Sequence, residues 1–232
     1  IIKTMNGMAY GLFATLIIGT ILATVSGFFT EGSFFQVNLF HLSDLLKKLM
    51  GAGIGLGIAW SLKLDGLKLV MAAVVGQVAT YMAGTPGFSI GDPLVVYIVA
   101  ILTILITQIV LRRKTPVDIL IIPLFMSLVA FGITYLIASP ISSVTTTVGD
   151  FVNSATEYQP FIMGVVIAVV MGMALTSPIS SAAIAVMIGL SGIAAGAAVV
   201  GGSVQMIGFA VMSRKDNNIG TVLSVGFGTS ML

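Results

Sequence analysis

Long apolar runs alternate along the chain with short polar or glycine-rich segments. A helix needs about 20 apolar residues to cross the hydrocarbon core of a bilayer, and lipid cannot satisfy exposed backbone amides, so helices are the expected form. Runs that approach or exceed this length occupy residues 5–29, 67–83, 94–111, 119–138, 161–175 and 193–212, with shorter ones at 51–62 and 180–190. The pattern predicts an all-α, polytopic helical membrane protein that forms a single transmembrane domain over residues 1–232.

Two segments between these runs are more polar. In residues 30–48, apolar side chains recur at helical spacing with charged side chains between them: Phe40, Leu42, Leu45, Leu46 and Leu49 against Asp44, Lys47 and Lys48. This pattern is typical of an amphipathic helix that lies in the membrane interface. Residues 141–158 are rich in Ser, Thr, Asn and acidic side chains, which predicts a polar loop with room for an interfacial helix.

Glycine and proline interrupt the apolar pattern in residues 174–190 and 220–232. Pro178 cannot donate a backbone hydrogen bond and disfavours helix at Ser177, so we expect the chain to break there and to start a new helix at about residue 179. Secondary transporters build solute sites near the middle of the bilayer from interrupted helices of this kind. Both segments are therefore candidate re-entrant elements, and a simple proline kink between two ordinary spans is the alternative.

Hydroxyl and amide side chains gather at the same interruptions. The predicted solute-binding set is Thr176, Ser177, Pro178, Ser180, Ser181, Gln205, Gly228, Thr229 and Ser230. Gln205 is included because an amide within a span needs a hydrogen-bond partner, which is either another helix or the solute. A helix that starts at about residue 179 would direct its amide groups into the cavity, which suits a neutral solute or a small anion.

Small residues recur at spacings of two and four. Gly51, Gly53, Gly55 and Gly57 form one crowded set, and the pairs Gly192 and Gly196, Ala197 and Gly201, and Ala198 and Gly202 form another. Small residues at such spacings let helices approach closely, so helix packing is the favoured interpretation of both sets. Gln77 and Gln108, like Gln205, are amides in apolar runs and need partners.

The composition indicates that lipid is the solvent for much of the surface. Hydrophobic residues make up 57% of the 232 residues, charged residues make up 8%, and the mean hydropathy is +1.14, whereas a soluble domain carries about 25% charged residues. The net charge of +2 is too small for a nucleic-acid partner. The chain has no cysteine, and its one histidine, His41, lies in the expected interfacial helix. We therefore expect no catalytic residue, no metal site and no cofactor.

Lysine and arginine cluster between the spans and predict the orientation of the chain. With Lys3 in the cytoplasm and alternating spans, the basic residues of 63–68, 112–114 and 214–215 also fall inside. The last cluster falls inside only if 180–190 and 193–212 are separate passages, which predicts a break near Ser191 and Gly192.

Four strings of residues carry a resemblance to a known family. They are Met5-Asn6-Gly7-Met8-Ala9, Ser177-Pro178-Ile179-Ser180-Ser181-Ala182-Ala183, Gln205-Met206-Ile207-Gly208-Phe209-Ala210 and Gly228-Thr229-Ser230-Met231-Leu232. On these strings the chain resembles the membrane-embedded enzyme IIC-like family of the bacterial sugar phosphotransferase system. More narrowly, it is similar to the perfringolysin-regulator-type branch of that family.

The resemblance implies a permease-like, enzyme IIC-like transporter domain that crosses the bacterial plasma membrane several times and forms a homodimer. Enzyme IIC domains receive their phosphoryl group from a partner whose phosphorylated residue is usually Cys or His. Because this chain has no Cys and its only His is His41, phosphoryl transfer would need separate phosphotransferase proteins as partners. Family members usually continue beyond the end of this chain, so we expect the full protein to be longer.

Taken together, these patterns predict a membrane transporter for a small polar solute, such as a sugar or a small organic acid, and not an enzyme. One alternative is a membrane-embedded solute sensor or regulator, although the short cytoplasmic loops leave little surface for a partner. A second alternative is a structural membrane subunit that packs through its glycine and alanine faces and has no solute site.

Overall fold

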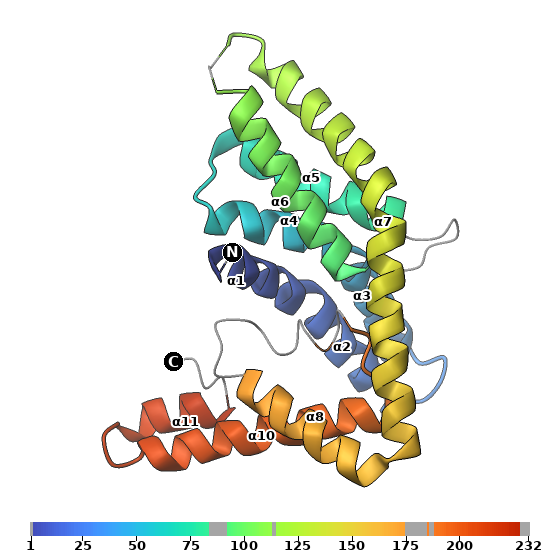
Figure 1. The fold of residues 1–232 in the computed structure, drawn as a ribbon, viewed down its shortest axis with the longest axis vertical. Coiled ribbons are helices and arrows are strands. Elements are labelled where there is room, and N and C mark those ends of the chain that lie inside the picture. Colours follow the sequence, from blue (N-terminus) through green and yellow to red (C-terminus); the bar gives the residue numbers. More distant parts are fainter. Residues whose placement is uncertain (1, 84–91, 113–114, 175–184, 186–187, 228–232) are drawn as a thin grey trace. The chain divides into compact units, whose positions relative to one another are not determined.

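The computed structural model describes residues 2–83, 92–112, 115–174, 185 and 188–227, and the regular elements in these ranges are helices (Figure 1). The chain divides into two compact units, Ile1–Ser142 and Ser143–Leu232, where the sequence pattern predicted a single domain. Within the described ranges, four helices are long and apolar enough to cross a membrane: Lys3–Ser26, Pro93–Val110, Asp118–Tyr158 and Gly192–Ser213. The prediction of a polytopic helical membrane protein is confirmed.

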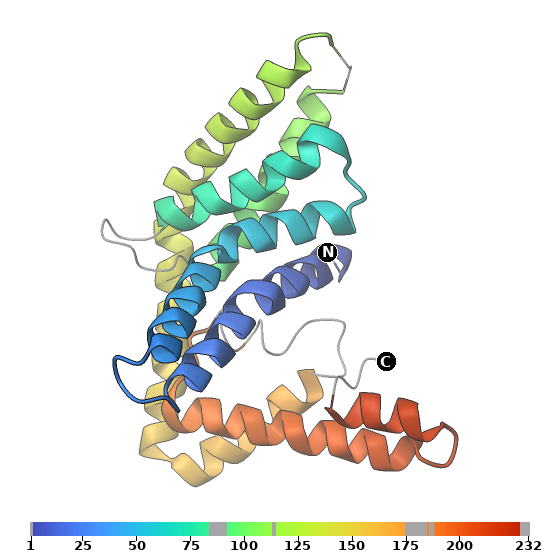
Figure 2. The same cartoon turned by 180° about the vertical axis from the view of Figure 1, so that it is seen from behind.

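The first unit begins with a long helical hairpin. One arm consists of α1 (Ile2–Leu12), the π-helical segment η1 (Phe13–Ile17) and α2 (Ile18–Ser26), which follow one another directly. The other arm consists of α3 (Phe34–Lys48) and α4 (Met50–Ser61). Helix α1 packs on α4 and α2 packs on α3, so the two arms run antiparallel over their whole length (Figure 2). Helices α5 (Gly66–Ala83) and α6 (Pro93–Val110) then pack against α4 and against each other.

Helix α4 makes close contacts on two faces, and alternating glycines make both contacts possible. Gly53 and Gly57 face α1, and Gly51 and Gly55 face α5, each so close to the neighbouring backbone that a Cβ would not fit. An ideal Cβ on Gly53, for example, would lie 2.9 Å from the carbonyl oxygen of Gly11. The packing interpretation of this glycine set is therefore confirmed, and the set serves two neighbours at once.

Gln77 of α5 occupies the break between α3 and α4. Its Oε1 accepts a hydrogen bond from the Ala52 amide at 3.1 Å, and its Nε2 donates to the Lys48 carbonyl at 2.9 Å. In a continuous α-helix the Ala52 amide would donate to the Lys48 carbonyl itself, four residues earlier. The side-chain amide of Gln77 takes the place of that bond, so its partner is the backbone at the break.

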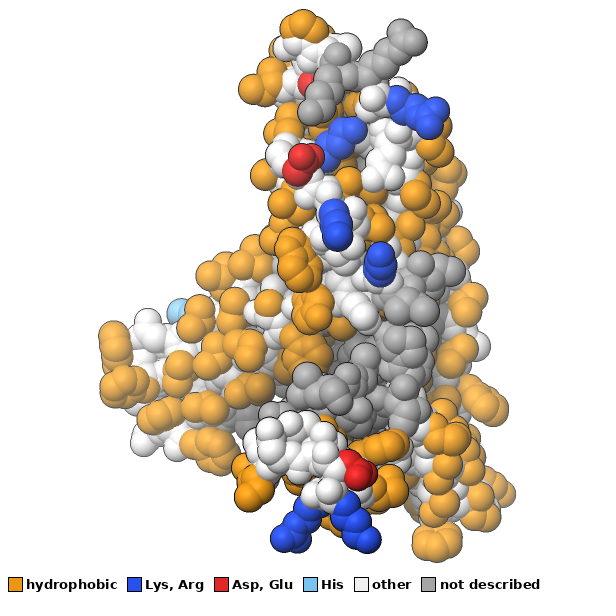
Figure 3. Space-filling view, turned by 90° about the vertical axis from the view of Figure 1, so that its left-hand side faces the viewer, with side chains coloured by type: hydrophobic (Ala, Val, Ile, Leu, Met, Phe, Trp, Pro, Cys, Tyr) orange, Lys and Arg blue, Asp and Glu red, His pale blue; other side chains and the backbone are white. Residues whose placement is uncertain are grey.

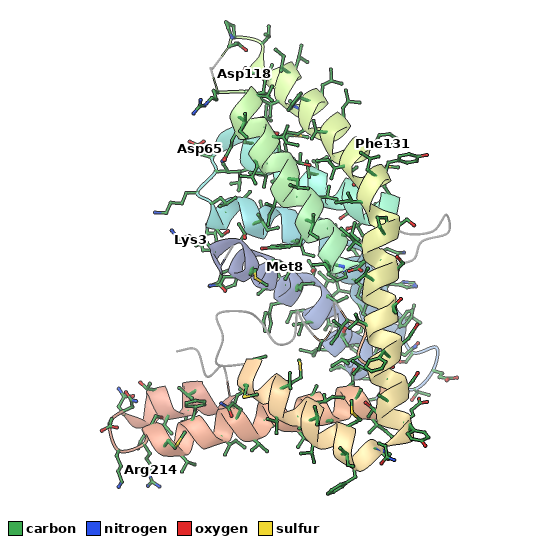
Figure 4. All side chains as sticks on the ribbon, viewed as in Figure 1. Lys3, Met8, Asp65, Asp118, Phe131 and Arg214 are labelled. Carbon is green, nitrogen blue, oxygen red and sulfur yellow. The ribbon has the colours of Figure 1, made fainter. Side chains whose placement is uncertain are left out.

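The helix directions bring Lys3 and Lys68 of the first unit to one end. Because α1 runs antiparallel to α4, Lys3 lies near the C-terminal end of α4. Lys68 donates from Nζ to the Leu111 carbonyl at 3.1 Å, just past the end of α6, where the helix dipole favours a positive charge. Lys3, Asp65 and Asp118 lie along this side of the unit in Figure 4. Figure 3 views the same side, where lysine and arginine form small clusters on a mostly hydrophobic surface.

Helix α7 (Asp118–Tyr158) continues through Pro140 and over residues 141–158, where the sequence pattern predicted a polar loop. The loop prediction is wrong because polar side chains in this part are satisfied within the helix. The hydroxyls of Thr147 and Thr156 donate to carbonyl oxygens four residues earlier, at 2.7 and 2.6 Å. With 41 residues, α7 is about 60 Å long, twice the thickness of the hydrocarbon core.

The second unit contains the C-terminal part of α7 and three further helices. They are α8 (Pro160–Ala174), α10 (Gly192–Ser213) and α11 (Ile219–Phe227). A small hydrophobic core joins α7, α8 and α10: Ile167 and Met171 of α8 and Ala194 of α10 are buried together, and Val152 of α7 and Leu190 pack against them. Helix α10 lies at the centre of this arrangement, because both α8 and α11 pack on it.

Candidate solute site

One residue of the predicted solute site, Gln205, lies in the described part of the chain. The remaining members lie outside the described residues: Thr176, Ser177, Pro178, Ser180, Ser181, Gly228, Thr229 and Ser230. The described part of the site therefore consists of Gln205 and of helices α8 and α11, which precede residues 176–181 and 228–230 in the sequence. All of them belong to the second unit.

Helices α8 and α10 form a close parallel pair, since Gly164 faces Ala197 and Gly172 faces Gln205. A Cβ on Gly201 of α10 would collide with the backbone of Ala168, and a Cβ on Gly172 would lie 3.7 Å from the Cβ of Gln205. The Gln205 side chain thus starts at the α8–α10 contact, near the C-terminal end of α8. Among the described residues, a Cβ on Gly192 or Gly196 would meet no neighbouring helix within 4 Å. The packing interpretation of the second set therefore holds for Gly201 and is wrong for Gly192 and Gly196.

Helix α11 approaches the same stretch of α10. A Cβ on Gly226 would lie 3.3 Å from the Cβ of Ala210, so α11 runs back along α10 toward Gln205. Helices α8 and α11 therefore both direct their C-terminal ends at the middle of α10 (Figure 1). The predicted solute-binding residues of 176–181 and 228–230 follow these two ends directly in the sequence.

The amide of the Gln205 side chain can both donate and accept hydrogen bonds. It is partly exposed, and its amide makes no hydrogen bond to any residue that the structure describes. Its neighbours Val204 and Ile207 are apolar and exposed, as expected for a helix that faces lipid. An amide without a partner in an apolar environment costs about 2–7 kcal/mol, so a polar partner for Gln205 is strongly favoured.

The residues that precede and follow Gln205 in the sequence are uncharged over a long stretch. Between Glu157 and Arg214 and after Asp216 the chain has no charged residue. Arg214, labelled in Figure 4, lies at the turn between α10 and α11, nine residues after Gln205 and thus about 13 Å away along the helix axis. The arrangement is polar and uncharged, which suits recognition by hydrogen bonds.

Asn153 of α7 has a role that the sequence pattern missed, since its segment was predicted to be a loop. Its Nδ2 donates to the Gly189 carbonyl at 3.1 Å, and its Oδ1 accepts from the Ser191 amide at 3.1 Å. Gly189 and Gly192 have φ of 63° and 52°, a backbone conformation that favours glycine. Helix α10 begins at Gly192, so the predicted break near Ser191 and Gly192 is confirmed. Asn153 fixes the turn from which the helix carrying Gln205 starts.

Several apolar helices of membrane-crossing length define a polytopic helical membrane protein. A family model described as "Phosphotransferase system, EIIC" matches residues 2–232, so the chain belongs to this family of membrane components of sugar transport. The family resemblance predicted from the sequence is thereby confirmed. No curated protein and no solved structure matches the chain.

Proposed function

We propose that the chain forms the solute-translocating part of a sugar transporter and that a neutral sugar binds beside Gln205. The observation that carries the proposal is the convergence of α8 and α11 on the part of α10 that holds Gln205. The predicted hydroxyl residues of 176–181 and 228–230 follow those two helices in the sequence and would complete the site. Alternating access would move one group of helices against another around this point.

A neutral sugar fits the described surroundings better than a small organic acid. Helices α8 and α11 direct their C-terminal ends toward the site, and these ends carry partial negative charge. No lysine or arginine occurs between residues 158 and 213 to offset that charge. The amide of Gln205 can donate and accept hydrogen bonds, as sugar hydroxyls can, so the two groups are complementary without a net charge.

Four finer assignments belong to the same proposal. The transporter would lie in the bacterial plasma membrane, would form a homodimer and would belong to the perfringolysin-regulator-type branch of the family. Because the chain has no Cys and only His41, separate phosphotransferase proteins would supply any phosphoryl group.

The proposal is tested first by ligand-dependent thermal stability. The full-length protein, purified in detergent, is heated in the presence of a panel of neutral sugars and small organic acids. A specific ligand at a hundredfold excess over its dissociation constant stabilises a protein by about 2.7 kcal/mol. We expect a sugar to raise the melting temperature, and we expect Gln205→Met to abolish that rise while Gln108→Met, on the exposed face of α6, leaves it intact.

The possible outcomes separate the functional classes. Stabilisation by organic acids alone would overturn the neutral-sugar assignment, and stabilisation that persists in Gln205→Met would place the site elsewhere. A sugar that binds but is not taken up by proteoliposomes would favour the sensor function over transport. No stabilisation by any compound would favour a structural subunit.

A further inference from the structure

Both arms of the first hairpin are broken at the same level. In one arm, η1 (Phe13–Ile17) interrupts the α-helical pattern, and the Thr15 hydroxyl donates to the Gly11 carbonyl at 2.7 Å, a bond that often bends helices. In the other arm, the break falls at Leu49, which has φ of −81° and ψ of 3°, and Gln77 satisfies the backbone there. Segment η1 packs against both α3 and α4, so the two breaks are neighbours.

The shared level of the breaks coincides with the end of α5. A Cβ on Gly51, two residues after Leu49, would collide with Thr80 near the C-terminal end of α5, which is Ala83. Helix α5 has 18 residues and starts at the basic end of the unit. Its length of about 27 Å is close to the hydrocarbon thickness of about 30 Å. Helices α2 and α3 continue past the level at which α5 ends.

The part of the hairpin beyond the breaks carries a large exposed apolar surface. On α2 it consists of Ile18, Ile21 and Val25, on α3 of Phe35, Leu42 and Leu45, at the break of Leu49, and at the tip of Phe28, Phe29 and Phe34. At the tip, Phe28 is 83% exposed and Phe34 is 76% exposed, and the rings of Phe29 and Phe35 stack with centroids 5.8 Å apart. Proteins in water rarely expose a continuous apolar surface of this kind.

Helix α3 has two further faces that differ from the apolar one. Toward α2, the Ser43 hydroxyl donates to the Gly19 carbonyl at 2.6 Å. A third face carries His41, Asp44 and Lys48, and a 2.7 Å ion pair joins Asp44 to Lys48. The hydrogen bond and the negative charge of Asp44 raise the pKa of Lys48, so Lys48 stays protonated at neutral pH. A helix with an apolar face and a charged face, at the edge of the hydrocarbon core, has the pattern of an interfacial helix.

We propose that the α2–α3 hairpin is a lipid-binding element that bends away at η1 and Leu49 and lies along the membrane surface opposite the basic end. The apolar face of α3 and the tip phenylalanines enter the boundary of headgroups and acyl chains, and His41, Asp44 and Lys48 face water. The level of the breaks argues for lipid as the occupant, because a surface that begins about 27 Å from the basic end lies beside the headgroups on the other side of the hydrocarbon core. Aromatic residues are enriched at this boundary.

The test uses the absence of cysteine from the chain, since single cysteines can be introduced without background labelling. Spin labels are attached one at a time to positions 35–48 of the full-length protein in vesicles of phosphatidylethanolamine and phosphatidylglycerol. Collisions with oxygen and with a water-soluble nickel complex then give the depth of each label. We expect the depth to oscillate with the helical period about a constant mean. The labels at Leu42 and Leu45 should lie about 5–10 Å into the boundary, and that at His41 at the aqueous surface.

Exposed positions on α6 provide the matched control. Labels at Leu102, Leu105 and Ile109 should change depth steadily, by about 1.5 Å per residue, because α6 is long and apolar enough to cross the membrane. A steady change of the same kind along α3 would overturn the proposal, since α3 would then cross the membrane. Uniform access to nickel would mean that the hairpin projects into water, and strong spin–spin broadening at Leu42 would mean that a second copy covers the face. Any variant with a lowered melting temperature is replaced by the position one or two turns away.

Discussion

Three glutamines lie in apolar helices, and each has different surroundings. Gln77 bridges two backbone groups at the α3–α4 break, Gln108 is exposed on α6, and Gln205 lies at the α8–α10 contact with no described hydrogen-bond partner. An amide without a hydrogen-bond partner is costly in an apolar environment, so the groups that each glutamine can reach decide its cost. Gln77 is satisfied by the fold, whereas Gln205 leaves its donor and acceptor for the proposed solute.

The role of Gln77 predicts a specific loss of stability. Gln77→Met keeps the size of the side chain but leaves the Ala52 amide and the Lys48 carbonyl without their partner. We expect the free energy of unfolding to fall by about 1–3 kcal/mol, since each of the two lost hydrogen bonds contributes about 0.5–1.5 kcal/mol. Chemical unfolding in mild detergent measures this difference. Gln108→Met is the control and should change stability by less than about 0.5 kcal/mol, and equal losses in the two variants would contradict the bridging role.

The two hydrogen bonds of Asn153 predict that its substitution will loosen the 189–191 turn locally. Asn153→Ala removes both hydrogen bonds that hold the 189–191 turn, which together contribute about 1–3 kcal/mol. We expect faster hydrogen exchange at the Ser191 amide, by roughly tenfold or more, with little change in α8. Asn38→Ala is a suitable comparison because Asn38 bonds only within its own helix, to the Phe34 carbonyl. Unchanged exchange at Ser191 in Asn153→Ala would show that the turn is held by other contacts.

At the scale of elements, the two-faced packing of α4 predicts opposite effects of one kind of substitution. Gly55→Ala and Gly57→Ala add a methyl group where the backbones of α5 and α1 leave no space, so each should destabilise the protein by about 1–3 kcal/mol or more. Gly132→Ala in α7 adds the same group where no atom lies within 4 Å. Alanine is the better helix former, so Gly132→Ala should be neutral or should stabilise by up to about 1 kcal/mol. Melting temperatures in detergent provide the comparison, and the same sign for all three variants would refute it.

The limits of sequence-based prediction are also clearest at the scale of elements. Apolar runs predicted the helices well, because in lipid the length of a run and the need for internal hydrogen bonds decide the structure. The helical part of α7 after Pro140 could not be predicted, since hydroxyl bonds within the helix and the contact of Asn153 with the 189–191 turn stabilise it. The glycine set of α4 indicated close packing, but which glycine faces which neighbour depends on the positions of α1 and α5.

The candidate site shows the same division between local pattern and tertiary arrangement. The sequence identified Gln205 as an amide in need of a partner. Helix α8 packs parallel to α10 and α11 packs antiparallel to it, which brings the C-terminal ends of both helices toward Gln205. That convergence depends on contacts between residues far apart in the chain, such as Gly226 with Ala210. The Asn153 contact was missed for the same reason, because its partners lie 36 and 38 residues away.

At the scale of the whole molecule, the positions of the basic residues give the chain an orientation. The first unit gathers Lys3 and Lys68 at one end, and the tip of the α2–α3 hairpin, which contains Glu31, lies at the other. Basic residues near the ends of spans stay on the cytoplasmic side. For the second unit, the corresponding cluster is at the turn between α10 and α11. If residues 180–190 form a separate passage, as the sequence pattern predicts, the alternation of spans would put that turn on the cytoplasmic side as well.

This orientation is tested by labelling single cysteines in intact cells with a maleimide that does not cross the membrane. The cysteines replace Glu31 at the hairpin tip, Asp65 between α4 and α5, and Asn217 between α10 and α11, all of them exposed. We expect Glu31→Cys to react in intact cells, and Asp65→Cys and Asn217→Cys to react only after the membrane is opened. Reaction of Asp65→Cys in intact cells would reverse the orientation of the first unit. Reaction of Asn217→Cys alone would mean that the number of passages between the two basic clusters is odd, and residues 180–190 would then not form a separate passage.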